Sequence, residues 1–258
     1  MSGIDHYENF PVASWLCPAP LRPAVAAIYH FARTADDMAD EGEADADTRL
    51  RSLQAYAHDL QACADNPLFV SPQWPQVFTP LATQIQSHAL PLQPMLDLLD
   101  AFAQDVRYTQ AQHRYASRAE LLDYCRRSAN PVGRLVLHLY GVHDEVALAQ
   151  SDAICSALQL INFWQDLSVD LPRGRHYLPE GQSLTEEMKF ARQHMLQASP
   201  LVHKVPGRGG WELRLVVQGG LRILDKLEGM NPYQHRPTLQ ALDMVVMFWR
   251  AVWMRKTV

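Results

Sequence analysis

Two short acidic stretches carry the residue types and spacings in this sequence that suit the binding of a cation. In the stretch from Gln159 to Asp170, QLINFWQDLSVD, the residues Asn162, Asp166 and Asp170 recur every four residues. That spacing puts them on one face of a helix, so that an amide and two carboxylates point the same way. The earlier stretch from Arg33 to Glu41, RTADDMADE, repeats the arrangement. Two such stripes predict a cation that they share.

The ordinary alternative for either stretch is a solvated helix face, which most runs of Asp and Glu form. In the earlier stretch, Asp36 and Asp40 share a face with Arg33 one turn before them, and Asp37 lies beside Asp36. Both stretches fall in the last turns of their expected helices, where the helix dipole disfavours each carboxylate by about 0.3 to 1 kcal/mol. A bound cation removes that conflict. Carboxylate-rich sites without Cys or His suit Mg²⁺ completed by substrate phosphate.

Basic and aromatic residues accompany the acidic ones. Arg173, Arg175 and Tyr177 directly follow the second stretch, and three arginines lie further back: Arg126, Arg127 and Arg134. Each alone has a surface ion pair as its ordinary interpretation, but beside Mg²⁺ a guanidinium group is a natural donor to a departing diphosphate. The carbocation left behind needs a dry cavity with aromatic faces. Five residues are spaced to supply them, with core packing as an equal alternative for each: Tyr29, Phe31, Tyr140, Phe163 and Trp164.

The elements that must position these residues are all expected to be helices. Prolines, glycines and two capping boxes, at Ser117 and Ser183, predict the boundaries. The expected helices are 21–41, 47–64, 76–88, 92–108, one from 117, 145–170, one from 183, 211–227 and 237–255. The helix from 117 must bend or break near Asn130-Pro131, because proline removes a helical donor. The glycines at 207, 209 and 210 are expected to separate two helices. One all-α domain covering residues 1–258 is the economical interpretation.

Composition limits the class of protein. The 258 residues, 48% of them hydrophobic, suffice for a real core, and the net charge of -5 gives no case for nucleic acid or an anionic membrane as the main partner. Four distant cysteines without a CxxC pair suit reduced thiols, and the segment Met1 to Asn9 is too polar for a signal peptide. We therefore expect a cytoplasmic protein.

The most apolar stretch, 241–252, is too short to span a bilayer. Core packing is its more ordinary interpretation. Its residues Trp249 and Trp253 can also make peripheral contact with the inner membrane, or with another enzyme of the same pathway.

Three segments together resemble the squalene/phytoene synthase family: RTADDMADE at 33–41, YCRRSANPVGRL at 124–135 and QLINFWQDLSVDLPRGRHYLP at 159–179. The last is highly specific, and the resemblance extends over most of the chain. It implies an isoprenoid-synthase-type helical bundle around a central cavity, and Mg²⁺-dependent ionisation of a prenyl diphosphate. The implied metal ligands, for two or three ions, are Asp36, Asp37, Asp40, Asn162, Asp166 and Asp170. The implied diphosphate-binding residues are Arg33, Gln159, Asn162, Arg173, Arg175 and Tyr177.

Within the family, the opening GIDHYENFPVASWLCPAPLRPAVAAIYHFARTADDMADEG looks most like the hopanoid-pathway branch, the hydroxysqualene synthases of the HpnC type. Members that couple two farnesyl diphosphates usually carry a Ser-Phe-aromatic segment before the first helix, where this chain has Asn9 to Ser14, NFPVAS. The resemblance thus implies ionisation of presqualene diphosphate, rearrangement of the cyclopropylcarbinyl cation and capture by water to give hydroxysqualene. No NADPH is expected.

Three other interpretations stay open. The chain can instead couple farnesyl or geranylgeranyl diphosphate head to head, as a presqualene diphosphate, squalene or phytoene synthase. It can be a non-catalytic assembly factor of similar fold, although its intact Asp36, Asp40, Asp166 and Asp170 argue against that. It can be a helical lipid-binding protein, which would take up its ligand without Mg²⁺.

Overall fold

The computed structural model describes residues 16–66 and 68–254. The described residues contain helices and no strand, so the all-α prediction is confirmed, and none of these helices is long and apolar enough to cross a membrane. The segment Asn9 to Ser14 lies outside the described residues. The elements are α1 (Arg22–Asp40), α2 (Ala46–Asp65), α3 (Pro75–His88), α4 (Gln93–Gln110), α5 (Arg118–Ser128), α6 (Asn130–Leu139), α7 (Glu145–Gln165), α8 (Leu167–Asp170), η1 (Leu171–Arg173), α9 (Leu184–Ala198), η2 (Ser199–His203), α10 (Gly207–Glu228) and α11 (Ala241–Val252).

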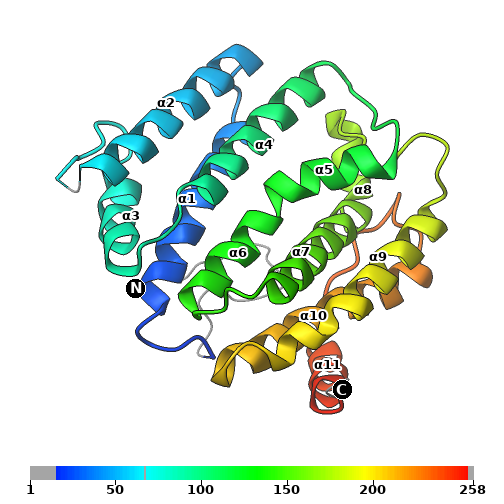
Figure 1. The fold of residues 1–258 in the computed structure, drawn as a ribbon. Helices are drawn as coiled ribbons and strands as arrows, with labels where there is room; N and C mark the ends of the chain where they lie inside the picture. Colours follow the sequence, from blue (N-terminus) through cyan, green and yellow to red (C-terminus); the bar gives the residue numbers. More distant parts are fainter. Residues whose placement is uncertain (1–15, 67, 255–258) are drawn as a thin grey trace.

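The helices form two packed groups with α5, α6 and α7 between them. Figure 1 shows α2, α3 and α4 on one side and α9, α10 and α11 on the other. In the first group α1 packs against α2, α3 and α4, and the rings of Phe31 and Tyr56 stack with their centroids 5.1 Å apart. In the second, α7 packs against α9 and α10. The first and second acidic stretches therefore belong to different groups.

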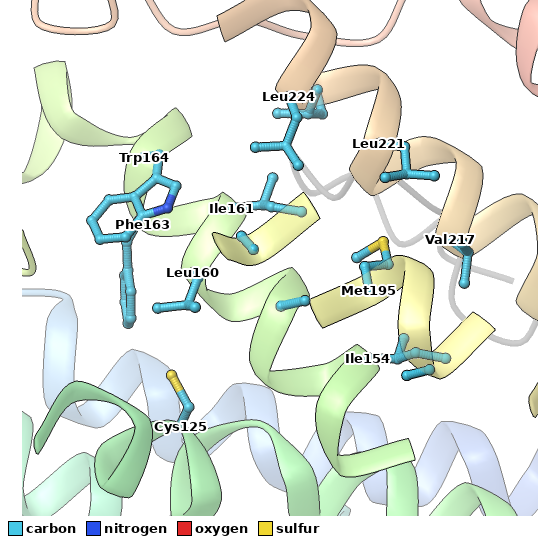
Figure 2. Packing of buried hydrophobic residues seen from close by; sticks show 14 of the residues in the cluster. Cys125, Ile154, Leu160, Ile161, Phe163, Trp164, Met195, Val217, Leu221 and Leu224 are labelled. Atoms are coloured by element: carbon cyan, nitrogen blue, oxygen red, sulfur yellow. The ribbon is translucent and has the colours of Figure 1, made fainter. Parts of the chain in front are cut away.

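The second group has its own hydrophobic core, built on α7. Trp164 and Leu160 of α7 have no exposed surface, and Ile161 packs toward Leu224 of α10 and Met195 of α9 (Figure 2). Each fully buried side chain of this size stabilises the fold by about 1.5 to 3 kcal/mol. All four cysteines are free thiols, and Cys125 is buried in this core. This packing holds α7, and with it the second acidic stretch, in place.

Local sequence signals explain where the helices begin and break. The Ser117 hydroxyl accepts a hydrogen bond from the Glu120 N–H at 3.2 Å, and a serine begins α9 in the same way. In a complete capping box the Glu120 carboxylate would accept a hydrogen bond from the Ser117 N–H. Here it accepts instead from the Ala116 N–H at 2.8 Å. The predicted break is confirmed: α5 ends before Asn130, and Pro131 lies in the first turn of α6.

The second acidic stretch lies on a bent helix rather than a continuous one. The expected helix 145–170 is interrupted at Asp166, whose φ and ψ are -100° and 9°. The hydrogen bonds from the Asp166 N–H to the Asn162 carbonyl and from the Asp170 N–H to the Asp166 carbonyl persist, at 2.9 and 2.8 Å. At the bend, the Gln165 amide donates to the Pro237 carbonyl at 2.6 Å. The segment before α11 is thereby fixed beside the stripe.

The expectation that glycines at 207–210 separate two helices is wrong, because α10 begins at Gly207. A Cβ atom on Gly209 would lie 2.5 Å from the ring of Tyr140, and one on Gly210 would lie 2.6 Å from the carbonyl oxygen of Val205. These glycines allow close packing, and that packing outweighs the helix-propensity cost of about 1 kcal/mol for each.

Candidate active site

A cavity of about 780 Å³ lies among the helices, apolar along its walls and charged at one end. The apolar lining comes from several helices, with Ile28 on α1, Val132 and Val136 on α6, Leu158 on α7 and Val216 on α10. A wider polar space of about 1290 Å³ adjoins the charged end. Charged residues from three parts of the chain line both spaces: Arg33, Asp36, Asp40, Glu41, Asp166, Asp170, Arg175 and Arg236.

Most of the residues predicted for the site are brought together here. Nine line the cavity: Arg33, Asp36, Asp40, Gln159, Asn162, Asp166, Asp170, Arg175 and Tyr177. Arg173 lines only the adjoining polar space, and Asp37 lines neither. Neighbouring helical residues point about 100° apart, so Asp37 turns away from the face that Asp36 and Asp40 share. The roles of these residues remain predictions.

Arg175 connects the two acidic stretches. Its Nη1 atom donates to Oδ2 of Asp40 at 2.7 Å, and its Nη2 atom donates to Oδ1 of the same carboxylate. The Asp170 carboxylate lies 3.9 Å from the same guanidinium group. All three side chains are largely buried. The α1 helix and the segment after α8 are therefore held together by opposite charges at the cavity's end.

Two further arginines bind the remaining carboxylates. Arg33 lies 3.3 Å from Asp36 and 2.6 Å from Asp37, and Arg236 donates to Asp166. Within the described residues, no three Asp, Glu, His or Cys side chains are grouped closely enough to hold one metal ion as they stand. The arginines explain this separation, because each carboxylate turns toward a guanidinium group.

The pKa values of the cavity carboxyl groups show the cost of bringing these acids together. Desolvation and repulsion from Asp40 raise the pKa of Asp36 to about 7, against the attraction of Arg33. Desolvation, with repulsion from Asp166 and Asp40, raises the pKa of Asp170 to about 7 although Arg175 lowers it. A divalent cation bound by oxygen ligands would relieve this repulsion. The donor set thus fits Mg²⁺.

Two cavity residues, Arg236 and Asp105, were not predicted from the sequence. Arg236 comes from the segment between α10 and α11, where no local pattern marks it. Asp105 lies on α4 and accepts a hydrogen bond from the Tyr177 hydroxyl at 2.8 Å. Desolvation raises the pKa of Asp105 to about 6, while Arg175 lowers it. Helical periodicity could have revealed Asp105, because it lies seven residues, about two helical turns, after Leu98 and so shares the buried face of α4.

The other residues singled out from the sequence divide between the cavity and the core. Phe163 and Tyr29 line the cavity, and the Phe163 ring stacks on that of Tyr177 with centroids 3.8 Å apart. Phe31 and Trp164 have no exposed surface, so core packing is their role. The expectation that three arginines of α5 and α6 flank the site is wrong. They pair elsewhere, as Arg126–Asp123, Arg127–Asp100 and Arg134–Asp152.

Comparisons with known proteins agree with this arrangement. Residues 5–183 match the family model for squalene/phytoene synthase. A hydroxysqualene synthase of Rhodopseudomonas palustris is 38% identical, over 95% of this chain and 88% of its own length. One from Sinorhizobium fredii is 35% identical, over 93% of this chain and 86% of its own.

A solved structure is similar over nearly the same extent. The crystal structure of squalene synthase HpnC from Alicyclobacillus acidocaldarius superimposes with a TM-score of 0.75 at 32% identity, covering 89% of this chain and 91% of that one. The similarity therefore includes the helices that enclose the cavity and both acidic stretches. The chain belongs to the squalene/phytoene synthase family.

Proposed function

We propose that this protein converts presqualene diphosphate and water into hydroxysqualene and diphosphate. The observation that carries the proposal is one cavity with apolar walls and a charged end where two acidic stretches and three arginines meet. Such a cavity suits a long hydrocarbon with a diphosphate head. The hydroxysqualene synthases among the relatives, which align over most of the chain, support this choice of substrate.

In the proposed reaction, the bond between the substrate carbon and the diphosphate oxygen breaks, and its electron pair leaves with the diphosphate. The cyclopropylcarbinyl cation rearranges inside the cavity. Water forms the new carbon–oxygen bond and gives its proton to the released diphosphate. The faces of Phe163 and Tyr177 line this space and stabilise positive charge in a site shielded from bulk water.

The residues that would hold Mg²⁺ are Asp36, Asp40, Asp166 and Asp170, with Asn162 beside them; two or three ions are proposed. Bound there, Mg²⁺ supplies positive charge against the diphosphate as it departs. Asp37 joins this set only when its ion pair with Arg33 opens.

The arginines would exchange partners when substrate enters. Arg33, Arg175 and Arg236 bind carboxylates in this structure, and a diphosphate offers each guanidinium group a new acceptor at the same end of the cavity. Arg173 faces the outer polar space and would meet the diphosphate there, with the Gln159 amide inside. The Tyr177 hydroxyl donates to Asp105, and this hydrogen bond would orient the Tyr177 ring in the cavity.

Incubation of the purified protein with presqualene diphosphate, Mg²⁺ and ¹⁸O-labelled water tests the proposal. Hydroxysqualene carrying ¹⁸O is expected, its formation stopped by EDTA and unchanged by NADPH. Coupled product from farnesyl or geranylgeranyl diphosphate alone would assign the protein to the synthases that join two prenyl chains. Tight, Mg²⁺-independent uptake of the lipid without diphosphate release would make it a lipid-binding protein.

We further propose that the protein works in the cytoplasm or at the inner membrane. Its substrate must come from an enzyme that couples two prenyl diphosphates, and its product must pass to one that removes or uses the hydroxyl group. Both molecules carry thirty carbons and are poorly soluble, which favours transfer between neighbouring enzymes. Fractionation of cells expressing the tagged protein, with chemical crosslinking, tests this. Protein recovered in the soluble fraction without crosslinked partners would place it in the cytoplasm and contradict contact with the membrane and with neighbouring enzymes.

A further inference from the structure

The last helix presents an unusually apolar face to solvent. Only Asp243, Met247 and Ala251 of α11 are buried, and the helix packs mainly against α10 at the edge of the molecule (Figure 1). Leu242 is 80% exposed and Trp249 is 64% exposed. The other large apolar residues exposed along this face are Met244, Val245, Phe248, Val252 and Trp253. Core packing, the more ordinary interpretation of the two tryptophans, is therefore wrong.

Around this face the charge is positive, although the whole chain carries -5. Five basic side chains bond to α11 or line the groove beside it: Arg192, Arg214, Arg222, Lys226 and Arg250. Three acidic side chains pair with these bases, Asp225, Glu228 and Asp243, so the five bases outnumber the acids. Asp243 is 3% exposed and held by two of those bases, so it presents no negative charge outward.

The groove between α9, α10 and α11 is lined by both exposed apolar residues and basic side chains. Its volume is about 440 Å³, and it is lined by Arg192, Leu196, Trp249, Arg250 and Trp253 among others. At the far end of the face, the Arg214 guanidinium lies 4.6 Å from the centroid of the Trp211 ring, which is also exposed. Arginine beside exposed tryptophan is the combination that suits a boundary between charged headgroups and apolar chains.

We propose that α11 docks this protein side-on to a bilayer that contains anionic phospholipid. A helix of 12 residues is about 18 Å long, too short to span the roughly 30 Å of a hydrocarbon core, but suited to lying in the interface. Its tryptophans would sit among the headgroups while the basic rim meets the phosphates. This inference is independent of the reaction proposed for the cavity.

A second copy of the chain fits the face less well. Two copies meeting through α11 would bring two positive rims together, and like charges across an interface oppose association. An anionic surface complements the rim. The opposite face of α10 lines the cavity through Val216, Gly219 and Gly220, so the docking helix lies one helix away from the site.

The test is co-sedimentation of the full chain with vesicles of phosphatidylcholine alone or mixed equally with phosphatidylglycerol. Binding to the mixed vesicles is expected, weakened by added salt. The double variant Trp249→Ser/Trp253→Ser should lower this binding by about ten-fold or more, and Arg192→Gln/Arg250→Gln should remove the preference for the anionic lipid. The control Leu68→Ser/Val146→Ser changes two exposed apolar residues elsewhere and should bind normally.

Since no residue of α11 lines the cavity, both α11 variants should keep the turnover of detergent-solubilised substrate and the circular dichroism of the parent. Equal vesicle binding by the tryptophan variant and the parent would overturn the proposal, as would absence of binding to either vesicle. A parent that is dimeric in solution and becomes monomeric in the tryptophan variant would assign the face to a second copy instead.

Discussion

Arg175 binds Asp40 through two hydrogen bonds across 135 residues of sequence. The Arg175 side chain is only 11% exposed, so this bond lies in a region with little screening by water. It closes the charged end of the cavity by joining α1 to the segment after α8. The Arg175 guanidinium group thus lies at the end of the cavity where the diphosphate of the proposed substrate would be bound.

Replacement of Arg175 should therefore impair turnover more than folding. Arg175→Lys keeps the charge but loses the paired donors that match a carboxylate or phosphate. We expect kcat to fall about 100-fold or more, as for loss of a donor to developing charge. Diphosphate release under saturating substrate measures this. Arg134→Ala, which removes an ion pair outside the cavity, is the matched control and should keep its activity.

Arg236→Ala tests the arginine that the sequence did not reveal. Its loss removes a donor at the cavity and frees Asp166 from its ion pair. Since a hydrogen bond to a charged group contributes about 1.5 to 3 kcal/mol, the affinity for inorganic diphosphate with Mg²⁺ should fall about ten-fold or more. Calorimetric titration of the variant and the parent measures this. Unchanged affinity would place Arg236 outside the diphosphate site.

The stability of the metal-free protein should decrease as pH rises from about 4 to 7. The pKa values of Asp36 and Asp170 in the folded state are about 7, and that of Asp105 is about 6, all above the unfolded value of about 3.9. The folded state therefore holds more protons in this window, and unfolding releases them. Thermal unfolding in EDTA should give a lower Tm at pH 8 than at pH 5.

Two additions sharpen this pH experiment. Asp170→Asn cannot ionise at that position, so it should flatten the decrease between pH 5 and 8. Mg²⁺ with inorganic diphosphate should restore stability at pH 8 more than at pH 5, because protons compete with the metal at low pH. A parent Tm that rises steadily from pH 5 to 8 in EDTA would contradict the raised pKa values.

An ion pair outside the cavity, with a buried carboxylate, should control stability without affecting chemistry. Glu187 has no exposed surface and accepts hydrogen bonds from Arg118 at 2.7 and 3.0 Å. Arg118→Met leaves that carboxylate unpaired, which costs about 3 to 5 kcal/mol. Urea denaturation of the variant measures the loss. Arg126→Ala, which breaks an exposed pair with Asp123, should cost less than about 1 kcal/mol.

Sequence periodicity predicted the acidic part of the site because its residues repeat within single helices. Asp36 and Asp40, like Asp166 and Asp170, are four apart, and helix geometry alone puts each pair on one face. The same geometry explains Asp37, which adjoins Asp36 in sequence but turns away from the cavity. The helical fold followed for a similar reason, since capping and proline signals are local.

What periodicity missed depends on tertiary contacts. Arg236 reaches the cavity because the Gln165 amide fixes the neighbouring Pro237 carbonyl, a contact between residues 72 apart. For Trp249 and Trp253 core packing was the more ordinary of two interpretations, because apolar residues are usually buried. They are exposed because α11 packs mainly against α10, through its opposite face. The bend at Asp166 likewise could not be seen in a pattern that continues through it.

The pairing of arginines with carboxylates also couples the proposed binding of Mg²⁺ to that of diphosphate. If Mg²⁺ bound alone, it would displace the arginines from their carboxylates and leave the guanidinium groups without an anion. If diphosphate bound alone, it would draw the arginines away and leave the carboxylates to repel one another. Bound together, each ligand removes the cost of the other, which by linkage is positive heterotropic cooperativity. The protein should therefore bind either ligand weakly and the two together tightly, so that it retains Mg²⁺ mainly while a diphosphate is present.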